Sequence, residues 1–334
     1  MIAPELPAEL KIALEHKAHG LSRNDAATRA AAMSRTYRDG GNSSAIRTTA
    51  DALAYALARM PATYAAVTAS INALNEVRPD FAPQSLLDAG AGPGTATWAA
   101  AQAYATLDTL TLLDANTALR SLALEFAAAN NRMARIHYEA ADVRTKLTDM
   151  PPADLVIASY VIGELDAAAR TTLAATLWSR TRDTLLVIEP GTPAGYARII
   201  ALRTQLIAQG AHVIAPCPHD GACPLTAPDW CHFTQRLARS RAHKHLKGAE
   251  LPFEDEKFIY VALAHTPQAA RPARVLAQPQ MSKVAIHAKL CTATGIEIAT
   301  APRRDKAAYA QFRRLDWGDT IVDVPGPPKK SIPE

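Results

Sequence analysis

The sequence lacks the features that mark membrane-spanning and secreted proteins. Its 334 residues contain no uncharged apolar run of about 18 residues, so no membrane span is expected. The first turns carry Glu5, Glu9 and Glu15, whereas secretion signals begin with a basic and then an apolar region, and transit peptides avoid acids. With 49% hydrophobic and 20% charged residues, the chain has the composition of a soluble globular protein. We therefore expect a cytoplasmic protein, monomeric and not bound to membranes.

Cysteine is scarce and unevenly placed. There are four cysteines, Cys217, Cys223, Cys231 and Cys291, and none precedes residue 217. In a cytoplasmic chain, clustered thiols bind metal or do chemistry more often than they form disulfides. Their spacing lacks the paired C-x2-C of zinc ribbons, and four thiolates can hold zinc or an iron–sulfur cluster. Spacing alone leaves zinc, an iron–sulfur cluster and unconnected buried thiols open.

Positive charge is also unevenly distributed. Residues 232–334 contain 17 Lys and Arg against 10 Asp and Glu, whereas residues 1–231 contain 19 against 22. A basic C-terminal third on a slightly acidic body suggests a polyanionic partner such as RNA. The alternative is a basic surface that is simply solvated.

The hydrophobic pattern divides the chain into three parts. Apolar residues at three- and four-residue spacing predict an N-terminal helical region over residues 1–80. Over residues 81–265, short apolar strands alternate with helices, which is typical of a doubly wound, parallel α/β sheet. A Cys-rich insertion is expected at 216–250, and a basic extension at 266–334 with a β-hairpin (283–290 and 295–300) and a disordered tail. The expected strands of the sheet are 85–88, 109–114, 136–140, 154–159, 184–189, 212–215 and 258–264.

A glycine-rich turn follows the first expected strand. In Leu86–Thr95, Asp88 ends the strand, and Gly90, Gly92 and Gly94 let the backbone approach a ligand closely. The helix that follows presents free N–H groups and a positive dipole end, suited to the methionine carboxylate of S-adenosylmethionine. This pattern predicts a class I methyltransferase Rossmann-like fold. A nicotinamide dehydrogenase is the main alternative, but its usual motif, G-x-G-x-x-G, differs from this spacing.

Polar residues at the ends of the next strands complete the expected pocket. Asp114 ends the second strand, where an acid would accept hydrogen bonds from ribose hydroxyls. Asp142 follows the third strand, where the adenine amine would be recognised. Ser159, with Tyr160 and Glu164, lines the expected methyl-transfer face after the fourth strand. None of them identifies itself as a base or nucleophile, so catalytic residues remain unassigned.

Four segments together resemble a known family. They are Ala215–Leu225 (APCPHDGACPL), Trp230–Phe233 (WCHF), Arg59–Tyr64 (RMPATY) and Arg314–Asp319 (RLDWGD). They resemble the methyltransferase-like assembly factors of the mitochondrial small ribosomal subunit and their bacterial relatives, the family of methyltransferase-like protein seventeen. The likeness spans most of the chain, and the cysteine block is its most specific part.

The resemblance implies both a metal centre and a partner. It implies a 4Fe-4S cluster held by Cys217, Cys223, Cys231 and Cys291, with zinc as the alternative, and a role on small-subunit ribosomal RNA or a pre-ribosomal particle. S-adenosylmethionine binding is expected because the glycine loop is intact. The alternative function is an active S-adenosylmethionine-dependent rRNA methyltransferase with a structural zinc or iron–sulfur site.

Two basic segments follow cysteines and are expected to bind the RNA. One follows Cys231 and the other follows Cys291, so a four-thiolate site would bring them together into one surface. The predicted RNA-binding residues are Arg236, Arg239, Arg241, Lys244, Lys247, Arg303, Arg304, Lys306, Arg313 and Arg314.

Overall fold

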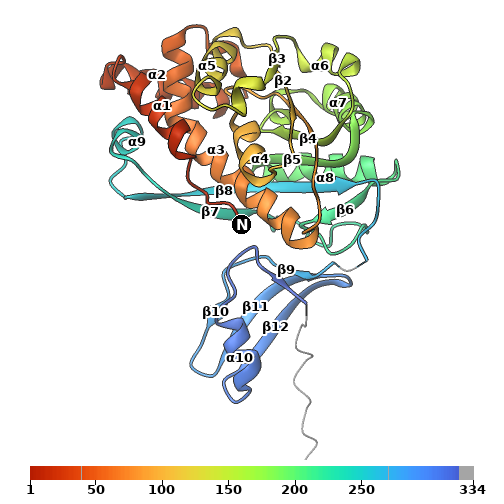
Figure 1. Ribbon diagram of the computed structural model, residues 1–334. Helices are drawn as coiled ribbons and strands as arrows, with labels where there is room; N and C mark the ends of the chain where they lie inside the picture. Colours follow the sequence, from red (N-terminus) through yellow and green to blue (C-terminus); the bar gives the residue numbers. More distant parts are fainter. Residues whose placement is uncertain (39, 270, 323–334) are drawn as a thin grey trace, which may run out of the picture.

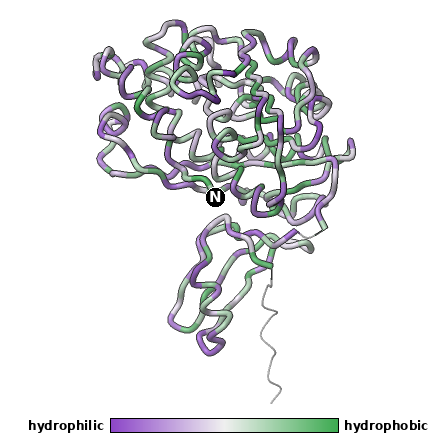
Figure 2. The backbone as a smooth tube through the Cα atoms, viewed as in Figure 1, coloured by the Kyte–Doolittle hydropathy of each residue, from purple (hydrophilic) through white to green (hydrophobic). Residues whose placement is uncertain are grey.

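The computed structural model describes residues 1–38, 40–269 and 271–322. The tail predicted to be disordered, residues 325–334, lies outside the described residues. The chain forms a large α/β body and a smaller C-terminal lobe below it (Figure 1). Hydrophobic segments concentrate in the strands inside the body, and hydrophilic ones follow its outer loops (Figure 2). Among the described helices, none is both long and apolar enough to cross a membrane.

The body is built on an eight-stranded sheet. Its strands are β1 (Ser85–Ala89), β2 (Thr109–Leu113), β3 (His137–Glu139), β4 (Ala153–Ser159), β5 (Thr181–Pro190), β6 (His212–Ala215), β7 (Phe233–Ala238) and β8 (Phe253–Ala264). The order is β3-β2-β1-β4-β5-β8-β6, with β7 paired to β8. β1 to β5 are parallel, and β8 enters antiparallel between β5 and β6. This order is that of the class I methyltransferase fold, which confirms the predicted fold class.

Helices cover both faces of the sheet. Alternate residues of a strand face opposite sides, so Leu86 and Ile157 pack under α1, α3, α4 and α5, whereas Leu87 and Val156 pack under α7 and α8. The sequence predicted the strands of this sheet except β7, whose buried positions are only Phe233 and Leu237. The helices are α1 (Ala8–Ala18), α2 (Arg23–Arg38), α3 (Thr49–Val77), α4 (Thr95–Ala103), α5 (Thr117–Ala127), α6 (Val143–Lys146), α7 (Ala167–Ser179), α8 (Pro193–Ile207) and α9 (Arg241–Leu246), with 3-10 turns at Ser43–Ala45, Met133–Arg135, Leu147–Asp149 and Ile162–Glu164.

The long helix α3 joins the N-terminal region to the sheet. It begins with a capping box, in which the Thr48 hydroxyl accepts from the Asp51 N–H and the Asp51 carboxylate accepts from the Thr48 N–H. Alanines such as Ala54 and Ala66 are fully buried, which lets the helix lie close to α4 and β8. The N-terminal helices are therefore part of the body's core.

The C-terminal lobe is a second sheet with its own small core. Its elements are β9 (Ala273–Val275), β10 (Gln280–Met281), β11 (Ala285–Thr292), β12 (Gly295–Pro302), β13 (Thr320–Ile321) and α10 (Lys306–Phe312). Phe312 of α10 packs on Val275 and Leu290 beneath it. The predicted hairpin is present as β11 and β12. The strands β9, β10 and β13 are two or three residues long, too short to give an alternating signal.

Candidate functional site

The glycine loop has the backbone that its sequence predicts. Gly90, Gly92 and Gly94 all adopt positive φ angles (75°, 52° and 79°), and Gly94 caps α4. A Cβ at Gly90 would lie 2.5 Å from a methyl carbon of Val161. Glycine is therefore required at position 90 for two reasons, the backbone angle and the lack of space for a side chain. The Val161 side chain packs directly beside the loop.

Asp88 ties the loop to the helix behind it. Its side chain is fully buried, and Oδ2 accepts from both the N–H and the hydroxyl of Thr97, at 3.1 and 2.7 Å. Its other oxygen, Oδ1, has no hydrogen-bond partner among the described residues. Burial raises the pKa of Asp88 to about 7, although the Thr97 bonds oppose this. The residue holds α4 against β1.

Asp114 lies where a ribose-binding acid is expected, but its carboxylate already has protein partners. It accepts from the Gly92 N–H at 2.9 Å and from the Asn116 N–H at 2.7 Å. Burial raises its pKa. A carboxylate has about four acceptor positions, so two remain for ribose hydroxyls.

The other two predicted pocket residues differ in role. Asp142 caps α6 by accepting from the Arg144 N–H, and its carboxylate pairs with the Arg144 guanidinium, which lowers the pKa of Asp142. Ser159 ends β4 and is half-buried at the expected edge. An adenine contact from Asp142 would compete with this ion pair.

A segment before α3 crosses the expected mouth of the pocket. We call Asn42–Ile46 the cover segment. The Asn116 amide donates to the carbonyls of Ser43 and Ile46, both at 2.9 Å, and the Ser43 N–H donates to Glu164 at 3.3 Å. Asn116 follows β2 and Glu164 follows β4, so the cover segment passes over the carboxyl edge on either side of β1. This contact could not be predicted from local sequence.

A partly buried polar network lies at the expected methyl-transfer face. The Tyr160 hydroxyl donates to Glu256 of β8 at 3.0 Å, and Arg59 of α3 approaches the same oxygen at 3.3 Å. Tyr160 adopts φ 58°, a left-handed conformation that costs a non-glycine residue about 1–2 kcal/mol. These contacts join α3, β4 and β8, and Glu256 and Arg59 were not predicted as site residues.

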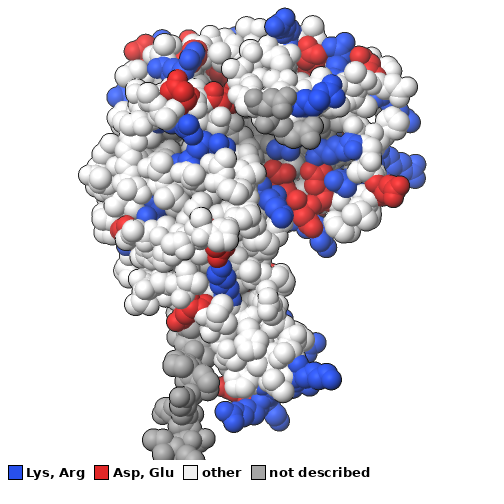
Figure 3. Space-filling model, turned by 180° about the vertical axis from the view of Figure 1, so that it is seen from behind, with Lys and Arg blue, Asp and Glu red and all other residues white. Residues whose placement is uncertain are grey.

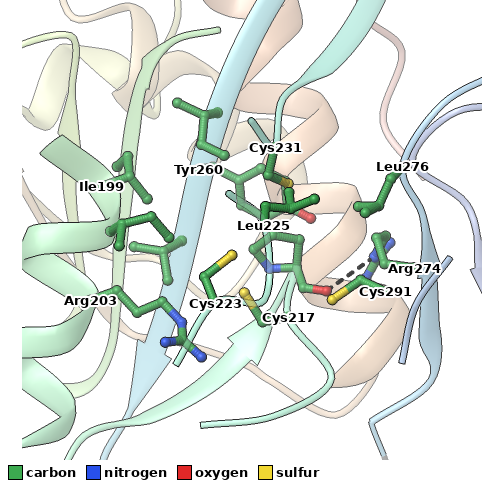
Figure 4. A pocket seen from close by; sticks show the side chains of 14 residues that line it. Ile199, Arg203, Cys217, Cys223, Leu225, Cys231, Tyr260, Arg274, Leu276 and Cys291 are labelled. Carbon is green, nitrogen blue, oxygen red and sulfur yellow. Dashed lines mark hydrogen bonds between the residues drawn. The ribbon is translucent and has the colours of Figure 1, made fainter. Parts of the chain in front are cut away.

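The four cysteines line one pocket, between the body and the C-terminal lobe (Figure 4). Cys217, Cys223 and Cys231 come from the loop between β6 and β7, and Cys291 comes from β11. Apolar side chains such as Leu225 complete the walls. The structure therefore brings together the four predicted ligands across 74 residues of sequence.

The thiols share the pocket without forming a closed ligand set. In the described part of the chain, no three His, Cys, Asp or Glu side chains are grouped as for a metal ion. The sulfurs on a tetrahedral zinc would lie about 3.8 Å apart, given Zn–S bonds of about 2.3 Å. Burial raises the pKa of Cys217, Cys231 and Cys291, the last to about 12, and neighbouring thiols add to this. The arrangement offers four soft donors on the walls of one pocket.

Two arginines and a tyrosine that the sequence did not single out also face this pocket. Arg203 of α8 and Arg274 of β9 lie on opposite sides of the sulfurs (Figure 4). The Tyr196 hydroxyl lies 3.2 Å from the Cys223 sulfur. Spacing along the chain gives no signal for residues that come from a helix and from a separate strand.

The two basic segments are not brought together. α9 lies against α2 and α3, whereas α10 lies on the C-terminal lobe (Figure 1). In the first segment, Arg236 pairs with Asp255, and both Arg239 and Lys247 pair with Glu254. Within that segment, Arg241 is exposed and Lys244 is half-buried.

The second basic segment is open to solvent. Arg303, Arg304, Lys306, Arg313 and Arg314, here called the C-terminal cations, are exposed, and the described residues offer none of them an ion pair. Lys and Arg gather at the free end of this lobe, whereas they mix with acids on the body (Figure 3).

Comparison with known proteins identifies the family. The model of the family described as "Mitochondrial small ribosomal subunit Rsm22" matches residues 49–322. The chain belongs to the Rsm22 family. The match includes the glycine loop, the four cysteines and the C-terminal lobe, and it confirms the resemblance found in the sequence.

Curated relatives are longer than this Rsm22 chain. The human ribosome assembly protein METTL17, mitochondrial, is 29% identical over 288 residues, which are 80% of this chain and 62% of the relative. Rsm22-cox11 tandem protein 2, mitochondrial, of Schizosaccharomyces pombe is 27% identical over 194 residues, 52% of this chain and 25% of that protein. The chain therefore spans about three fifths of the first relative and a quarter of the second.

The expectation of a cytoplasmic location is wrong by these comparisons. The family description and the names of both relatives are mitochondrial. The expectation came from acids near the start of the sequence, and a short N-terminal composition carries little information about location.

Solved structures that are similar to this chain cover part of it. Magnesium protoporphyrin IX methyltransferase from Synechocystis PCC 6803, with bound S-adenosylmethionine, covers 59% of this chain and 78% of its own, at 14% identity and a TM-score of 0.38. N-methyltransferase NodS from Bradyrhizobium japonicum WM9 covers 58% and 84%, at 12% identity and a TM-score of 0.39. The fold assignment rests on the strand order.

Proposed function

We propose that this Rsm22 chain is an assembly factor that contacts small-subunit ribosomal RNA and uses four cysteines to hold a 4Fe-4S cluster. One observation carries the proposal: Cys217, Cys223, Cys231 and Cys291 line one pocket where the body meets the C-terminal lobe. The relatives' names, which refer to ribosome assembly and the small ribosomal subunit, supply the partner.

The donor set fits a 4Fe-4S cluster. Four thiolates are the ligands that such a cluster takes, and the four cysteines line one pocket. Zinc can take the same four ligands, so the choice of a cluster over zinc follows the resemblance of the cysteine block to the family. When bound, the cluster would supply a rigid link between the two sheets and a redox-active centre. Cys291 would join β11 to the loop that carries the other three ligands.

The C-terminal cations supply the RNA-binding surface of this proposal. They are exposed on one lobe, whereas Arg236, Arg239 and Lys247 already have carboxylate partners. Free cations can neutralise phosphates and release counterions, and paired ones must first give up a partner. S-adenosylmethionine binding is also proposed, at the Gly90–Gly94 loop and Asp114, with the cover segment opposing it.

The first experiment tests the metal. Protein purified anaerobically from iron-supplemented cells is assayed for iron, sulfide and zinc, and for broad absorption near 400 nm. We expect close to four iron atoms per chain. Replacing any one of the four cysteines by Ser should lower this iron content. One zinc per chain and no iron would contradict the cluster.

The second experiment tests the RNA. Affinity for small-subunit rRNA fragments is measured across a salt series. Replacing Arg304, Arg313 and Arg314 by Gln should weaken binding and reduce the slope of log affinity against log salt by about 0.7–0.9 for each phosphate that is no longer neutralised. Replacing the paired set, Arg236, Arg239 and Lys247, is the matched control and should change the slope less. Equal effects of both sets would contradict the assignment of the surface.

A further inference from the structure

Two guanidinium groups are buried beside the four thiols. Arg203 is 1% exposed and Arg274 is 2% exposed, and both are among the largest fully buried side chains of the protein. Both line the pocket, one from α8 in the body and one from β9 in the C-terminal lobe. Guanidinium groups stay protonated in proteins, so the pocket wall carries two buried positive charges.

These two charges are neutralised less closely than those of other arginines nearby. Arg198 pairs with Glu189 at 2.7 Å, and Arg271 pairs with Asp220 at 2.6 Å. Arg203, by contrast, has no ion pair in the described part of the chain. Its Nη2 donates to a carbonyl, that of His219, at 2.7 Å.

A polar atom of Arg203 is left for an occupant, and the charge of Arg274 is only partly neutralised. The Nε of Arg203 is buried and has no hydrogen-bond partner among the described residues. Arg274 donates from Nη1 to the carbonyl of Gly318 at 2.7 Å and from Nε to the carbonyl of Pro216 at 3.4 Å. Its carboxylate partner, Glu76, lies 3.5 Å away on a half-exposed side chain. A buried charge without a full partner is strongly unfavourable unless an anion lies against it.

We infer that Arg203 and Arg274 are charge-balancing residues, which fit the pocket to an occupant with a formal charge of about −2. This inference rests on the proposed cluster. Four thiolates on a doubly positive 4Fe-4S core leave a formal charge of about −2, which the two arginines would cancel.

Cluster charge and hydrogen bonds to its sulfurs are two of the terms that set its reduction potential. Arg203 belongs to α8 of the body and Arg274 to β9 of the C-terminal lobe, so an anion bound between them also favours closure of the lobe on the body. Removing one positive charge near the cluster disfavours the added electron, and the midpoint potential should become more negative.

The test uses the full chain, purified anaerobically, with Arg203→Met and Arg274→Met, and with Arg203→Lys and Arg274→Lys as charge-keeping counterparts. Midpoint potentials are measured by redox titration followed by electron paramagnetic resonance, and iron is counted per chain. Lys283→Met, at an exposed position between β10 and β11, is the control for removal of a charge outside the pocket. Circular dichroism confirms the fold of each variant.

Both Met variants are expected to have a more negative midpoint potential than the wild type. The two Lys variants and Lys283→Met are expected to keep a midpoint potential near that of the wild type. Met variants that fold but carry no iron, beside Lys variants that do, would equally support charge balance. Unchanged potentials in the Met variants, or equal effects of Met and Lys, would overturn the inference. A wild-type chain without any cluster would instead overturn the proposed function, so the two failures are distinguishable.

Discussion

The glycine loop and the cysteine pocket differ in how far the protein satisfies its own polar groups. At the glycine loop, Asp114 and Asn116 already accept and donate within the chain, and the cover segment is held over the edge. At the cysteine pocket, Arg203 keeps an unpaired Nε beside soft thiol donors. The glycine loop also has one unpartnered buried atom behind it, Oδ1 of Asp88, but that carboxyl can take up a proton, whereas the Arg203 guanidinium stays charged. A buried charge without a partner is costly, so it marks the cysteine pocket as the place that needs an occupant.

The comparison teaches that an intact motif and an open site are separate properties. Gly90, Gly92 and Gly94 preserve the turn. Val161 nevertheless packs beside Gly90, and the cover segment is held over the same edge of the sheet. The cysteine pocket lacks a standard spacing motif, yet its geometry collects four donors and two cations.

Loss of one ligand should have the largest effect. Cys231→Ser should abolish iron binding and destabilise the C-terminal lobe, because metal-binding energy is also folding energy; the loss should exceed about 5 kcal/mol. Hydrogen exchange in β9 and β11 reports the loosening. Wild-type protein stripped of iron by a chelator is the control and should match the variant. Unchanged exchange in both strands would show that the pocket needs no occupant.

The second prediction concerns the buried acid behind the glycine loop. The pKa of Asp88 is about 7 in the folded protein against 3.8 when unfolded, because burial disfavours its charge. The folded state thus binds the proton more tightly, and the unfolding free energy should fall as pH rises from 4 to 7. Asp88→Asn keeps an acceptor for Thr97 and should remove up to about 4 kcal/mol of that fall.

The pH comparison isolates this one residue. Burial also raises the pKa of Glu164 to about 7, so it titrates over the same range. It is present in both the wild type and Asp88→Asn, so its contribution cancels in the difference between them. Chemical unfolding at pH 4, 5.5 and 7.5 gives the difference. If the unfolding free energies of the wild type and Asp88→Asn differ by the same amount at all three pH values, Asp88 is not the titrating group.

Sequence patterns predicted the sheet and the glycine loop because both depend on local periodicity and on glycine's backbone freedom. The resemblance to the family implied one ligand set of four cysteines, which spacing alone left open, and all four line one pocket in the structure. Sequence patterns missed Arg203, Arg274 and the cover segment, whose roles exist only through contacts between distant elements. Asp142 shows the converse, since an acid after a strand is equally suited to cap the next helix.

The third prediction separates space from backbone angle at the loop. Gly90→Ala should destabilise the protein by about 2–4 kcal/mol, since it combines a left-handed φ with a clash against Val161. Gly248→Ala is the matched control, because its φ is 57° with nothing within 4 Å of an added Cβ. It should cost only about 1 kcal/mol. Urea unfolding that gives equal losses for both would show that Val161 moves aside freely.

The smallest expected effect is on cofactor affinity. Asn116→Asp keeps the acceptor that caps α5 through the Leu119 N–H, but it removes the two donors that hold Ser43 and Ile46. Each net hydrogen bond contributes about 0.5–1.5 kcal/mol, so release of the cover segment should tighten S-adenosylmethionine binding about tenfold in calorimetry.

The matched control for this release lies at the other end of α5. Asn130→Asp keeps the acceptor for the Arg132 and Met133 N–H groups and removes a donor to Glu9, far from the glycine loop. It makes the same chemical change in a similar local setting, so it should leave cofactor affinity at the wild-type value. Tighter binding in Asn116→Asp alone would place the cover segment in competition with the cofactor. Unchanged or weaker binding in that variant would mean that the segment forms part of the pocket wall, and the contrast between a covered and an open site would then fail.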